Sequence, residues 1–278
     1  MKIDASYVLR EPEQGSAALP DSLDLLLTIG GSRVLGEIYL PSGVYESPHP
    51  AVVLCHGIPG TNCNDDLAQS LRRMGCVVLR LYHRGAWGSD GLYSFSHCLE
   101  DALYTANWAR EEAPKEYGID PENIFLAGHS NGGNTVLNAA RQLPWIKGIM
   151  AFCPFDHAAL RDLLQEEEIK ALFTEISAVL HIESPEALWQ DSFSHYKEWG
   201  FAQLAPEFQH RNLLLIGGKR DTVAPPDKMV LPLWNALEQL PTQANHKLVL
   251  LDSNHSLDTA RLALAETLGT WLEQVVKG

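Results

Sequence analysis

The sequence lacks the features that mark a membrane-spanning or disulfide-rich protein. It holds no stretch of about 18 apolar residues, so no transmembrane helix is expected. The opening residues, 1–6, show no apolar run behind Lys2, so no secretory signal is expected either. The five cysteines form an odd set without CxxC spacing, which predicts neither a disulfide framework nor a zinc site. These absences favour a reducing, cytoplasmic setting and a protein that works without a metal or other cofactor.

Positive charge is also scarce. The 278 residues hold 21 Lys or Arg against 35 Asp or Glu, which gives a formal net charge of −14. Nucleic acids and anionic membranes are polyanions, so this balance argues against both as partners. The hydrophobic content of 45% and charged content of 20% are those of an ordinary globular protein with a substantial core. Composition predicts neither the substrate nor whether copies of the chain associate.

What the sequence does have is a regular alternation of apolar runs and helical patterns. This alternation predicts an α/β fold with one mainly parallel sheet. Two strands, 23–29 and 34–40, are joined by a Gly-Gly-Ser turn. Six further strands are expected at 51–55, 76–82, 124–128, 146–153, 212–218 and 246–251. Helices are expected at 65–74, 97–113, 131–143, 227–239 and 256–276.

The alternation breaks in residues 156–207, which show helical stretches at 160–179 and 185–200 and no convincing strand. This segment holds 11 Asp or Glu against three Lys or Arg. We therefore predict a core made of residues 1–155 and 208–278, with 156–207 inserted into it as a helical cap over the active-site face. Functional insertions on α/β folds gather where loops already form the site. A solvated pair of helices without a gating role is the alternative.

The segment Gly128-His129-Ser130-Asn131-Gly132 fits the G-x-S-x-G nucleophile elbow. An apolar strand-like run precedes it and a helical pattern follows at once. Such a turn forces the central serine into a strained backbone conformation, and the two glycines let strand and helix approach closely. Ser130 is therefore the candidate nucleophile. A glycine-rich turn without chemistry is the alternative.

A serine hydroxyl needs a base within hydrogen-bond reach, and that base needs an anion to fix its tautomer. The carboxyl ends of parallel strands lie at one edge of a sheet, so loops far apart in sequence converge there. Asp221 and His255 follow the last two predicted strands, which makes them the candidate acid and base. Asp156 and Asp252 are the rival acids.

The order Ser, Asp, His, together with the elbow and the His56-Gly57 pair, resembles the α/β-hydrolase superfamily over residues 23–276. The segments 84–89 and 253–256 are similar to those of dienelactone-hydrolase-like, feruloyl-esterase-like and prolyl-oligopeptidase-like members. The loop 56–60 also looks like that of epoxide hydrolases and haloalkane dehalogenases. Those members use aspartate as nucleophile, so Ser130 removes them. The resemblance implies an eight-stranded, mostly parallel sheet flanked by helices, with a helical cap insertion.

The oxyanion hole is predicted from the backbone. The N–H of Asn131, directly after the nucleophile, is the first donor. The N–H of Ile58 is the second, because Gly57 permits a sharp turn and Pro59 has no N–H to offer. His56 is expected to orient this loop, and His129 to point away from the nucleophile.

Four aromatic side chains of the predicted cap are candidates for lining an acyl or aryl pocket. They are Trp189, Phe193, Tyr196 and Trp199. Packing between cap and core is the alternative reading of all four.

Together these residues predict a serine hydrolase that cleaves carboxylic esters of small or medium substrates (EC 3.1.1) through an acyl-enzyme. A prolyl-oligopeptidase-like peptidase or amidase and an acyltransferase are the alternatives that use the same residues. A ligand-binding receptor without catalysis is the alternative from a different class.

Overall fold

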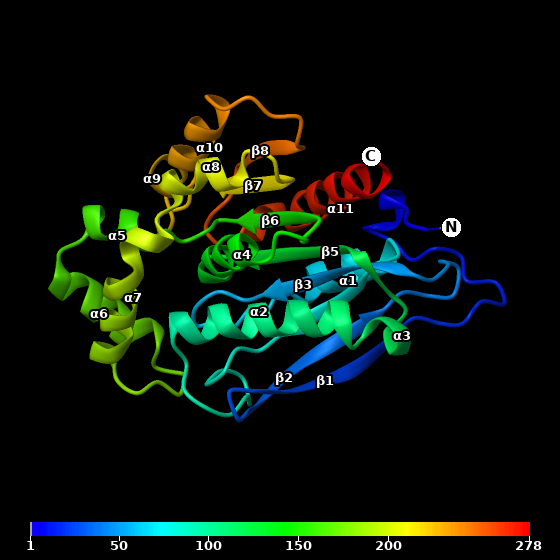
Figure 1. The fold of residues 1–278 in the computed structure, drawn as a ribbon, viewed down its shortest axis with the longest axis horizontal. Helices are drawn as coiled ribbons and strands as arrows, with labels where there is room; N and C mark the ends of the chain where they lie inside the picture. The colour runs from blue at the N-terminus through cyan, green and yellow to red at the C-terminus, as the bar shows by residue number, and fades with distance from the viewer. Residues whose placement is uncertain (1) are drawn as a thin grey trace.

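An eight-stranded sheet runs through the protein, of which the computed structural model describes residues 2–278 (Figure 1). The strands lie in the order β1-β2-β4-β3-β5-β6-β7-β8. Their bounds are β1 Asp21–Ile29, β2 Ser32–Leu40, β3 His49–Cys55, β4 Val77–Leu81, β5 Ile119–His129, β6 Gly148–Phe152, β7 Leu213–Gly218 and β8 His246–Leu251. Strand β2 pairs antiparallel with both β1 and β4, and β3 to β8 pair in parallel. The predicted mostly parallel, eight-stranded sheet is thus confirmed.

Helices cover both faces of the sheet. Helices α2 (Phe95–Glu111) and α4 (Asn131–Gln142) lie on one face, and α1 (Asp65–Arg73) and α11 (Arg261–Lys277) lie on the other (Figure 1). Each face has its own buried apolar cluster, built from alternate residues of the same central strands: Val53 and Leu79 belong to one, Val52 and Val78 to the other. This division follows from the period-two alternation of side chains along a strand.

Residues 157–208 form helices and no strand. They comprise α5 (His157–Leu163), α6 (Glu166–Ile176), α7 (Pro185–Trp199), η2 (Phe201–Leu204) and α8 (Ala205–Phe208). Helices α5 to α7 stand beyond the carboxyl ends of β5 and β6, at the left of Figure 1. A third apolar cluster joins them to the core, with Phe173 and Trp199 from the helices and Tyr93 and Ala224 from core loops.

The structure differs from the sequence prediction at four helices. The expected helix 160–179 is two helices, because Gln165 begins α6 with a capping box in which Glu168 accepts the Gln165 N–H. The expected helix 227–239 is divided at Val230 into α9 (Pro226–Met229) and α10 (Leu231–Glu238). The terminal helix begins at Arg261, and the short α3 (Pro114–Tyr117) was not foreseen.

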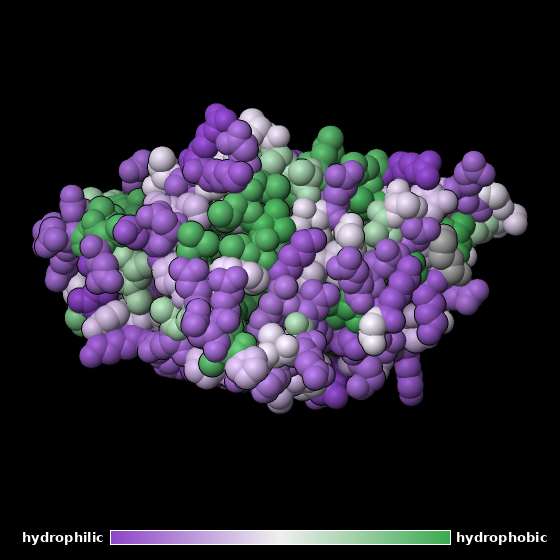
Figure 2. All heavy atoms as spheres, turned by 90° about the horizontal axis from the view of Figure 1, so that it is seen from above, coloured by the Kyte–Doolittle hydropathy of each residue, from purple (hydrophilic) through white to green (hydrophobic). Residues whose placement is uncertain are grey.

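Seen from the side of α10 and β8, the surface mixes polar side chains with an apolar area near the middle (Figure 2). Strand β8 lies at one end of the sheet and is half-buried along its whole length. Within residues 2–278 no helix combines the length and the apolar character that crossing a membrane requires.

Candidate active site

Ser130 stands in a sharp turn between β5 and α4. Its backbone has φ 55° and ψ −121°, a combination that residues with a side chain rarely adopt. A Cβ on Gly128 would lie 2.1 Å from the carbonyl oxygen of Gly132, and a Cβ on Gly132 would lie 2.3 Å from that of Cys55. Both flanking glycines are therefore required for strand and helix to approach so closely, as the elbow motif predicts.

The structure brings Ser130, His255 and Asp221 together. His255 Nε2 lies 2.9 Å from Ser130 Oγ, and His255 Nδ1 lies 2.7 Å from Asp221 Oδ2. Asp221 and Ser130 are each 5% exposed, so the contacts are shielded from solvent. The loops after β7 and β8 meet because Arg220 N–H donates to the Ser253 carbonyl at 3.0 Å. This geometry suits a proton passing from the serine to an imidazole whose far nitrogen is held by a carboxylate.

The surroundings of Asp221 keep it ionised. Burial alone would raise the pKa of its carboxyl, but the hydrogen bond and charge of His255 act in the opposite direction. The backbone N–H groups of Ala224 and Val223 also donate to Oδ1, at 2.7 and 2.9 Å. The net effect is a lowered pKa for Asp221. The carboxylate thus stays charged and fixes a proton on His255 Nδ1, which leaves Nε2 free to accept one from Ser130.

The two rival acids are engaged elsewhere. Asp156 Oδ1 accepts the Ala158 N–H at 2.8 Å and caps helix α5, while Oδ2 accepts the Phe201 N–H at 3.0 Å. Asp252 forms a two-pronged contact with the Arg220 guanidinium, at 2.7 and 2.6 Å, in an exposed position. Neither carboxylate hydrogen-bonds His255.

The two predicted oxyanion donors border the nucleophile. Asn131 is the first residue of α4 and is 1% exposed. Ile58 follows Gly57, whose position is so close to Ser130 that a Cβ there would lie 2.9 Å from the serine Cβ. Within residues 2–278 neither backbone N–H, of Ile58 or of Asn131, donates to a protein acceptor. Two unpaired donors beside a serine Oγ are what a tetrahedral oxyanion requires.

His56 fixes the loop that carries Ile58. Its Nδ1 donates to the Gly57 carbonyl at 2.6 Å, and its Nε2 accepts the His83 backbone N–H at 3.2 Å. Burial, with a smaller contribution from His83, lowers the pKa of His56 to about 3. The ring is therefore neutral and holds the loop in place, as predicted.

His129, predicted to point away from the nucleophile, contacts the loop that carries the candidate base. Its Nε2 donates to the backbone carbonyl of His255 at 2.9 Å, and the two imidazole rings lie 4.9 Å apart. Burial, and then the charge of His255, lower the pKa of His129 to about 3. His129 thus holds the loop of the candidate base. The contact joins residues 126 positions apart, and nothing in the local sequence signals it.

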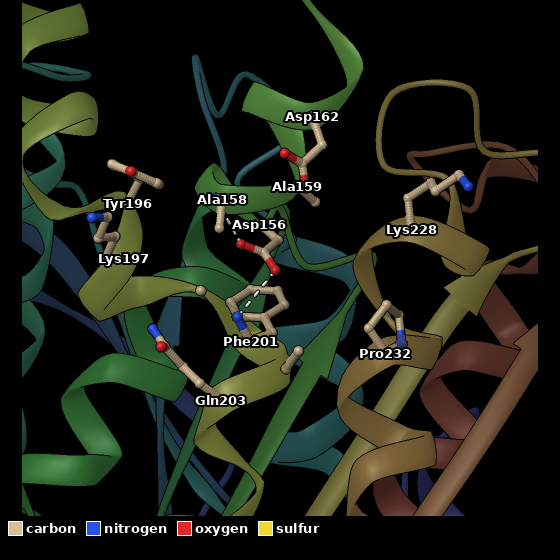
Figure 3. Close-up of a pocket in the computed structure, with 12 residues that line it drawn as sticks. Asp156, Ala158, Ala159, Asp162, Tyr196, Lys197, Phe201, Gln203, Lys228 and Pro232 are labelled. Carbon is tan, nitrogen blue, oxygen red and sulfur yellow. Dashed lines mark hydrogen bonds between the residues drawn. The ribbon is translucent and has the colours of Figure 1, made fainter.

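The four cap aromatics have different surroundings. Trp189 and Trp199 are buried, and Phe193 is 38% exposed. Tyr196 lines a pocket of about 410 Å³ between α5, α7, η2 and the helices α9 and α10 (Figure 3). Ser130, Asp221 and His255 do not line this pocket. The assignment of these aromatics to substrate binding therefore stays a prediction.

Among the described residues 2–278, one group of side chains has metal-ligand chemistry. Cys153, Asp221 and His255 place one ligand atom each within 4.8 Å of one another. However, His255 Nδ1 and an oxygen of Asp221 are already joined by a 2.7 Å hydrogen bond. A metal bound to Nδ1 would displace the proton that this bond contains, so we assign no metal here.

Comparison with known proteins agrees with this architecture. A family model described as "alpha/beta hydrolase fold" matches residues 55–224, which is more than half of the chain. The chain belongs to the α/β hydrolase fold family, and the resemblance predicted from its motifs is confirmed.

Curated relatives match over shorter stretches. The chain is 29% identical over 102 residues to lysophosphatidylserine lipase ABHD12 of Danio rerio, covering 36% of this chain and 25% of the relative. It is 26% identical over 163 residues to thiohydrolase aneE of Aspergillus aculeatus (55% and 48%). It is 29% identical over 125 residues to monoglyceride lipase of Rattus norvegicus (43% and 38%). The chain thus spans between a quarter and a half of the length of these relatives.

Solved structures share the fold over nearly the whole chain. The α/β hydrolase GrgF from Penicillium sp. sh18 superposes with a TM-score of 0.69 at 15% identity, covering 93% of this chain and all of that one. Est1E from Butyrivibrio proteoclasticus, solved with ferulic acid bound, gives 0.68 at 16% identity, covering 91% and 100%. At such identities the likeness describes the fold alone.

Proposed function

We propose that this protein is a serine hydrolase that cleaves carboxylic esters of small or medium-sized molecules. The observation that carries the proposal is a pair of contacts of His255. Its Nε2 lies 2.9 Å from Ser130 Oγ, and its Nδ1 lies 2.7 Å from Asp221 Oδ2. Esterases and lipases among the similar proteins support the hydrolase class. The residues use no metal or cofactor.

The reaction follows from the proton positions. His255 Nε2 takes the Ser130 proton as Oγ attacks the ester carbonyl, and Asp221 stabilises the imidazolium that forms. The N–H groups of Ile58 and Asn131 bind the oxygen that becomes negative, and loss of one such donor typically costs about 3 kcal/mol of barrier. His255 then protonates the leaving alcohol. Water, deprotonated by the same imidazole, releases the acid from Ser130.

We assign residues 156–207 the role of a cap over this site. The support is their place beyond the carboxyl ends of the strands and the apolar cluster that joins Phe173 and Trp199 to loop residues of the core. An insertion there borders the substrate, so acyl chain preference should follow its side chains.

The test is covalent labelling beside a substrate screen. A fluorophosphonate probe should label the wild-type protein once, and Ser130→Ala should abolish labelling. p-Nitrophenyl esters of increasing acyl length, assayed beside aminoacyl-p-nitroanilides, should be cleaved in preference to the anilides. Hydrolysis of the anilides alone indicates a peptidase, ester formation with alcohol acceptors indicates an acyltransferase, and an unlabelled, inert protein indicates a receptor.

Thioester hydrolysis is a second candidate, because one relative is a thiohydrolase. The same serine, imidazole and amides serve it, and a thiolate leaves without needing protonation. Matched acetyl esters of an alcohol and of the corresponding thiol separate the two: a thioester preference well above the intrinsic reactivity ratio, measured with hydroxide, favours the thiohydrolase.

A further inference from the structure

A buried line of hydrogen bonds connects the cap to the residue after the nucleophile. Ser192 Oγ in α7 lies 2.8 Å from His157 Nδ1 at the start of α5. His157 Nε2 lies 3.2 Å from Asn131 Oδ1, and Asn131 Nδ2 lies 3.2 Å from the Tyr93 hydroxyl. The four residues are between 0% and 4% exposed. The mechanism above uses only the backbone of Asn131 and leaves its side chain unexplained.

The donors and acceptors along this line have one consistent assignment. The Asn131 amide nitrogen faces Tyr93, so its carbonyl oxygen faces His157 and accepts. His157 Nε2 must therefore carry the ring proton, and Nδ1 must accept from the Ser192 hydroxyl. Burial, with a smaller effect of His195, lowers the pKa of His157 to about 3. The ring is a neutral donor towards Asn131 over the whole range of ordinary assays.

Aromatic rings prevent the imidazole from turning. Phe95, Phe155 and Trp199 lie edge-on to it, with ring centroids 4.4, 5.5 and 5.8 Å away. They come from α2, from the loop after β6 and from the end of α7. The ring itself is fully buried. A buried polar ring kept in one orientation by three apolar neighbours is a rigid positioning element for whatever it hydrogen-bonds.

The other neighbour of the Asn131 amide is also tied to the segment 156–207. Tyr93 N–H donates to the carbonyl of His181 at 2.7 Å, and His181 N–H donates to that of Gly85 at 2.8 Å. The Asn131 side chain is thus held on both sides by groups whose positions depend on the cap. Its own backbone N–H is a donor of the proposed oxyanion hole, where a misplacement of about 1 Å can cost about 100-fold in rate.

We propose that His157 is a positioning residue for the oxyanion hole, through which the cap contributes to the chemical step as well as to binding. It touches no reacting atom, and it acts by fixing Asn131. The inference rests on the proposed function of Ser130, Ile58 and Asn131. It gives the cap a role in catalysis at its junction with the core, in addition to its contact with the substrate.

The experiment compares two substitutions at position 157. His157→Phe keeps a ring of similar size but removes both nitrogens, and His157→Gln returns an amide donor near the place of Nε2. With p-nitrophenyl butyrate, His157→Phe should lower kcat about tenfold, a fraction of the 10²–10³ that outright loss of an oxyanion donor costs, with KM within about twofold. His157→Gln should recover most of the activity.

A second readout reports the oxyanion itself. Ser130 Oγ adds to the carbonyl of an alkyl trifluoromethyl ketone, and the adduct places an oxyanion in the hole. The inhibition constant of this ketone should therefore rise in His157→Phe by the same factor as kcat falls. Ser192→Ala keeps the ring but removes the donor to Nδ1, and it should give a smaller loss, about threefold. This milder variant tests the hydrogen bonds from Ser192 through His157 to Asn131 if His157→Phe does not fold.

The matched control is His195→Phe. His195 lies on α7 and stacks on the same Trp199 ring at 4.4 Å, but it is 37% exposed and does not contact Asn131. Its substitution should leave kcat and the inhibition constant at wild-type values. The inference is overturned if His157→Phe leaves kcat unchanged or changes KM alone. It is also overturned if His195→Phe loses as much activity, or if His157→Gln does not recover it. If the wild-type protein neither cleaves esters nor reacts with a fluorophosphonate, the proposed function itself has failed.

Discussion

The edge loops are built differently from the cap, residues 156–207. They comprise the last residues of β3, β5, β7 and β8 with the loops that follow these strands, and they carry Ser130, Asp221 and His255. Backbone hydrogen bonds between neighbouring strand ends hold the edge loops, such as Ser130 N–H to the Phe152 carbonyl at 3.1 Å. Inside the cap, cations lie against aromatic rings: the Arg161 guanidinium lies 4.0 Å from the Tyr196 ring centroid, and Lys170 Nζ lies 4.4 Å from that of Trp189. A few hydrogen bonds, such as His181 N–H to the Gly85 carbonyl at 2.8 Å, join the cap to the core.

This difference separates what each region can do. Loops anchored to a parallel sheet occupy positions fixed by strand order, so catalytic distances there are set by the fold. Most residues of the cap lie outside the hydrogen-bonded series of Ser130, His255 and Asp221 and join the core through an apolar cluster. We therefore expect substitutions in the edge loops to change kcat and most substitutions in the cap to change stability or KM, with His157 and its partner Ser192 as the exceptions.

The sharpest contrast is between two aspartates that follow neighbouring strands. Asp221→Asn should lower kcat about 10⁴-fold, because the amide favours the wrong tautomer of His255. Asp156→Asn, at the base of the cap, should cost about 1 kcal/mol of unfolding free energy because the buried Phe201 N–H loses its carboxylate acceptor, and it should lower kcat less than about tenfold. Steady-state kinetics and urea unfolding of both variants check this. Equal kinetic effects would contradict the assignment of the acid.

A glycine pair gives the next largest contrast. A Cβ at position 57 would lie 2.9 Å from the Ser130 Cβ, and one at position 200 would lie 2.9 Å from the Ala158 Cβ in the cap. Gly57→Ala should displace the Ile58 donor and lower kcat about 100-fold. Gly200→Ala, with the same crowding, should lower kcat less than about fivefold. Kinetics with one p-nitrophenyl ester decide between them, and a reversed order would place the oxyanion donor elsewhere.

His129 offers a smaller test within the edge loops. His129→Phe removes the donor to the His255 carbonyl and should lower kcat about tenfold, since one buried hydrogen bond of about 1 kcal/mol no longer fixes the base. His129→Gln should retain more activity. The rate of fluorophosphonate labelling at saturating probe measures the effect, and a rate equal to wild type in His129→Phe would show that the contact is incidental.

Buried histidines in both the edge loops and the cap should make the free energy of unfolding fall at acid pH. Burial lowers the pKa of His56, His129 and His157 to about 3. In the unfolded chain these groups take up protons near pH 6.5, whereas the folded protein keeps them neutral. The contribution of these three histidines to the free energy of unfolding is therefore complete above about pH 6.5. It is lost as pH falls towards 3, by about 1.4 kcal/mol per pH unit for each histidine.

Urea unfolding at pH 7.5, 6.0 and 5.0 measures this slope. His129→Phe in the edge loops and His157→Phe in the cap should each reduce it by one histidine's share. A free energy of unfolding that stays constant between pH 7.5 and 5.0 would contradict the neutral state of these rings.

The sequence was informative where chemistry imposes a local pattern. The elbow glycines, the apolar strands and the loops that carry Asp221 and His255 all follow from short-range spacing, and the structure brings these residues together. The break of the cap helix at Gln165 was missed, because the helical period continues through Leu164 while a capping box begins a new helix. The positioning contacts of His157 and His129 could not be predicted, since their partners are 26 and 126 residues away in sequence. Only tertiary packing specifies such contacts.

The most direct test is to trap the acyl group. Mixing the protein with excess p-nitrophenyl acetate should release a burst approaching one p-nitrophenolate per chain, and mass spectrometry after acid quench should place the acetyl group on Ser130. Ser130→Ala should show neither burst nor acetylation. An acetyl group on another residue of an active protein, or ester hydrolysis that persists in Ser130→Ala, would contradict the account.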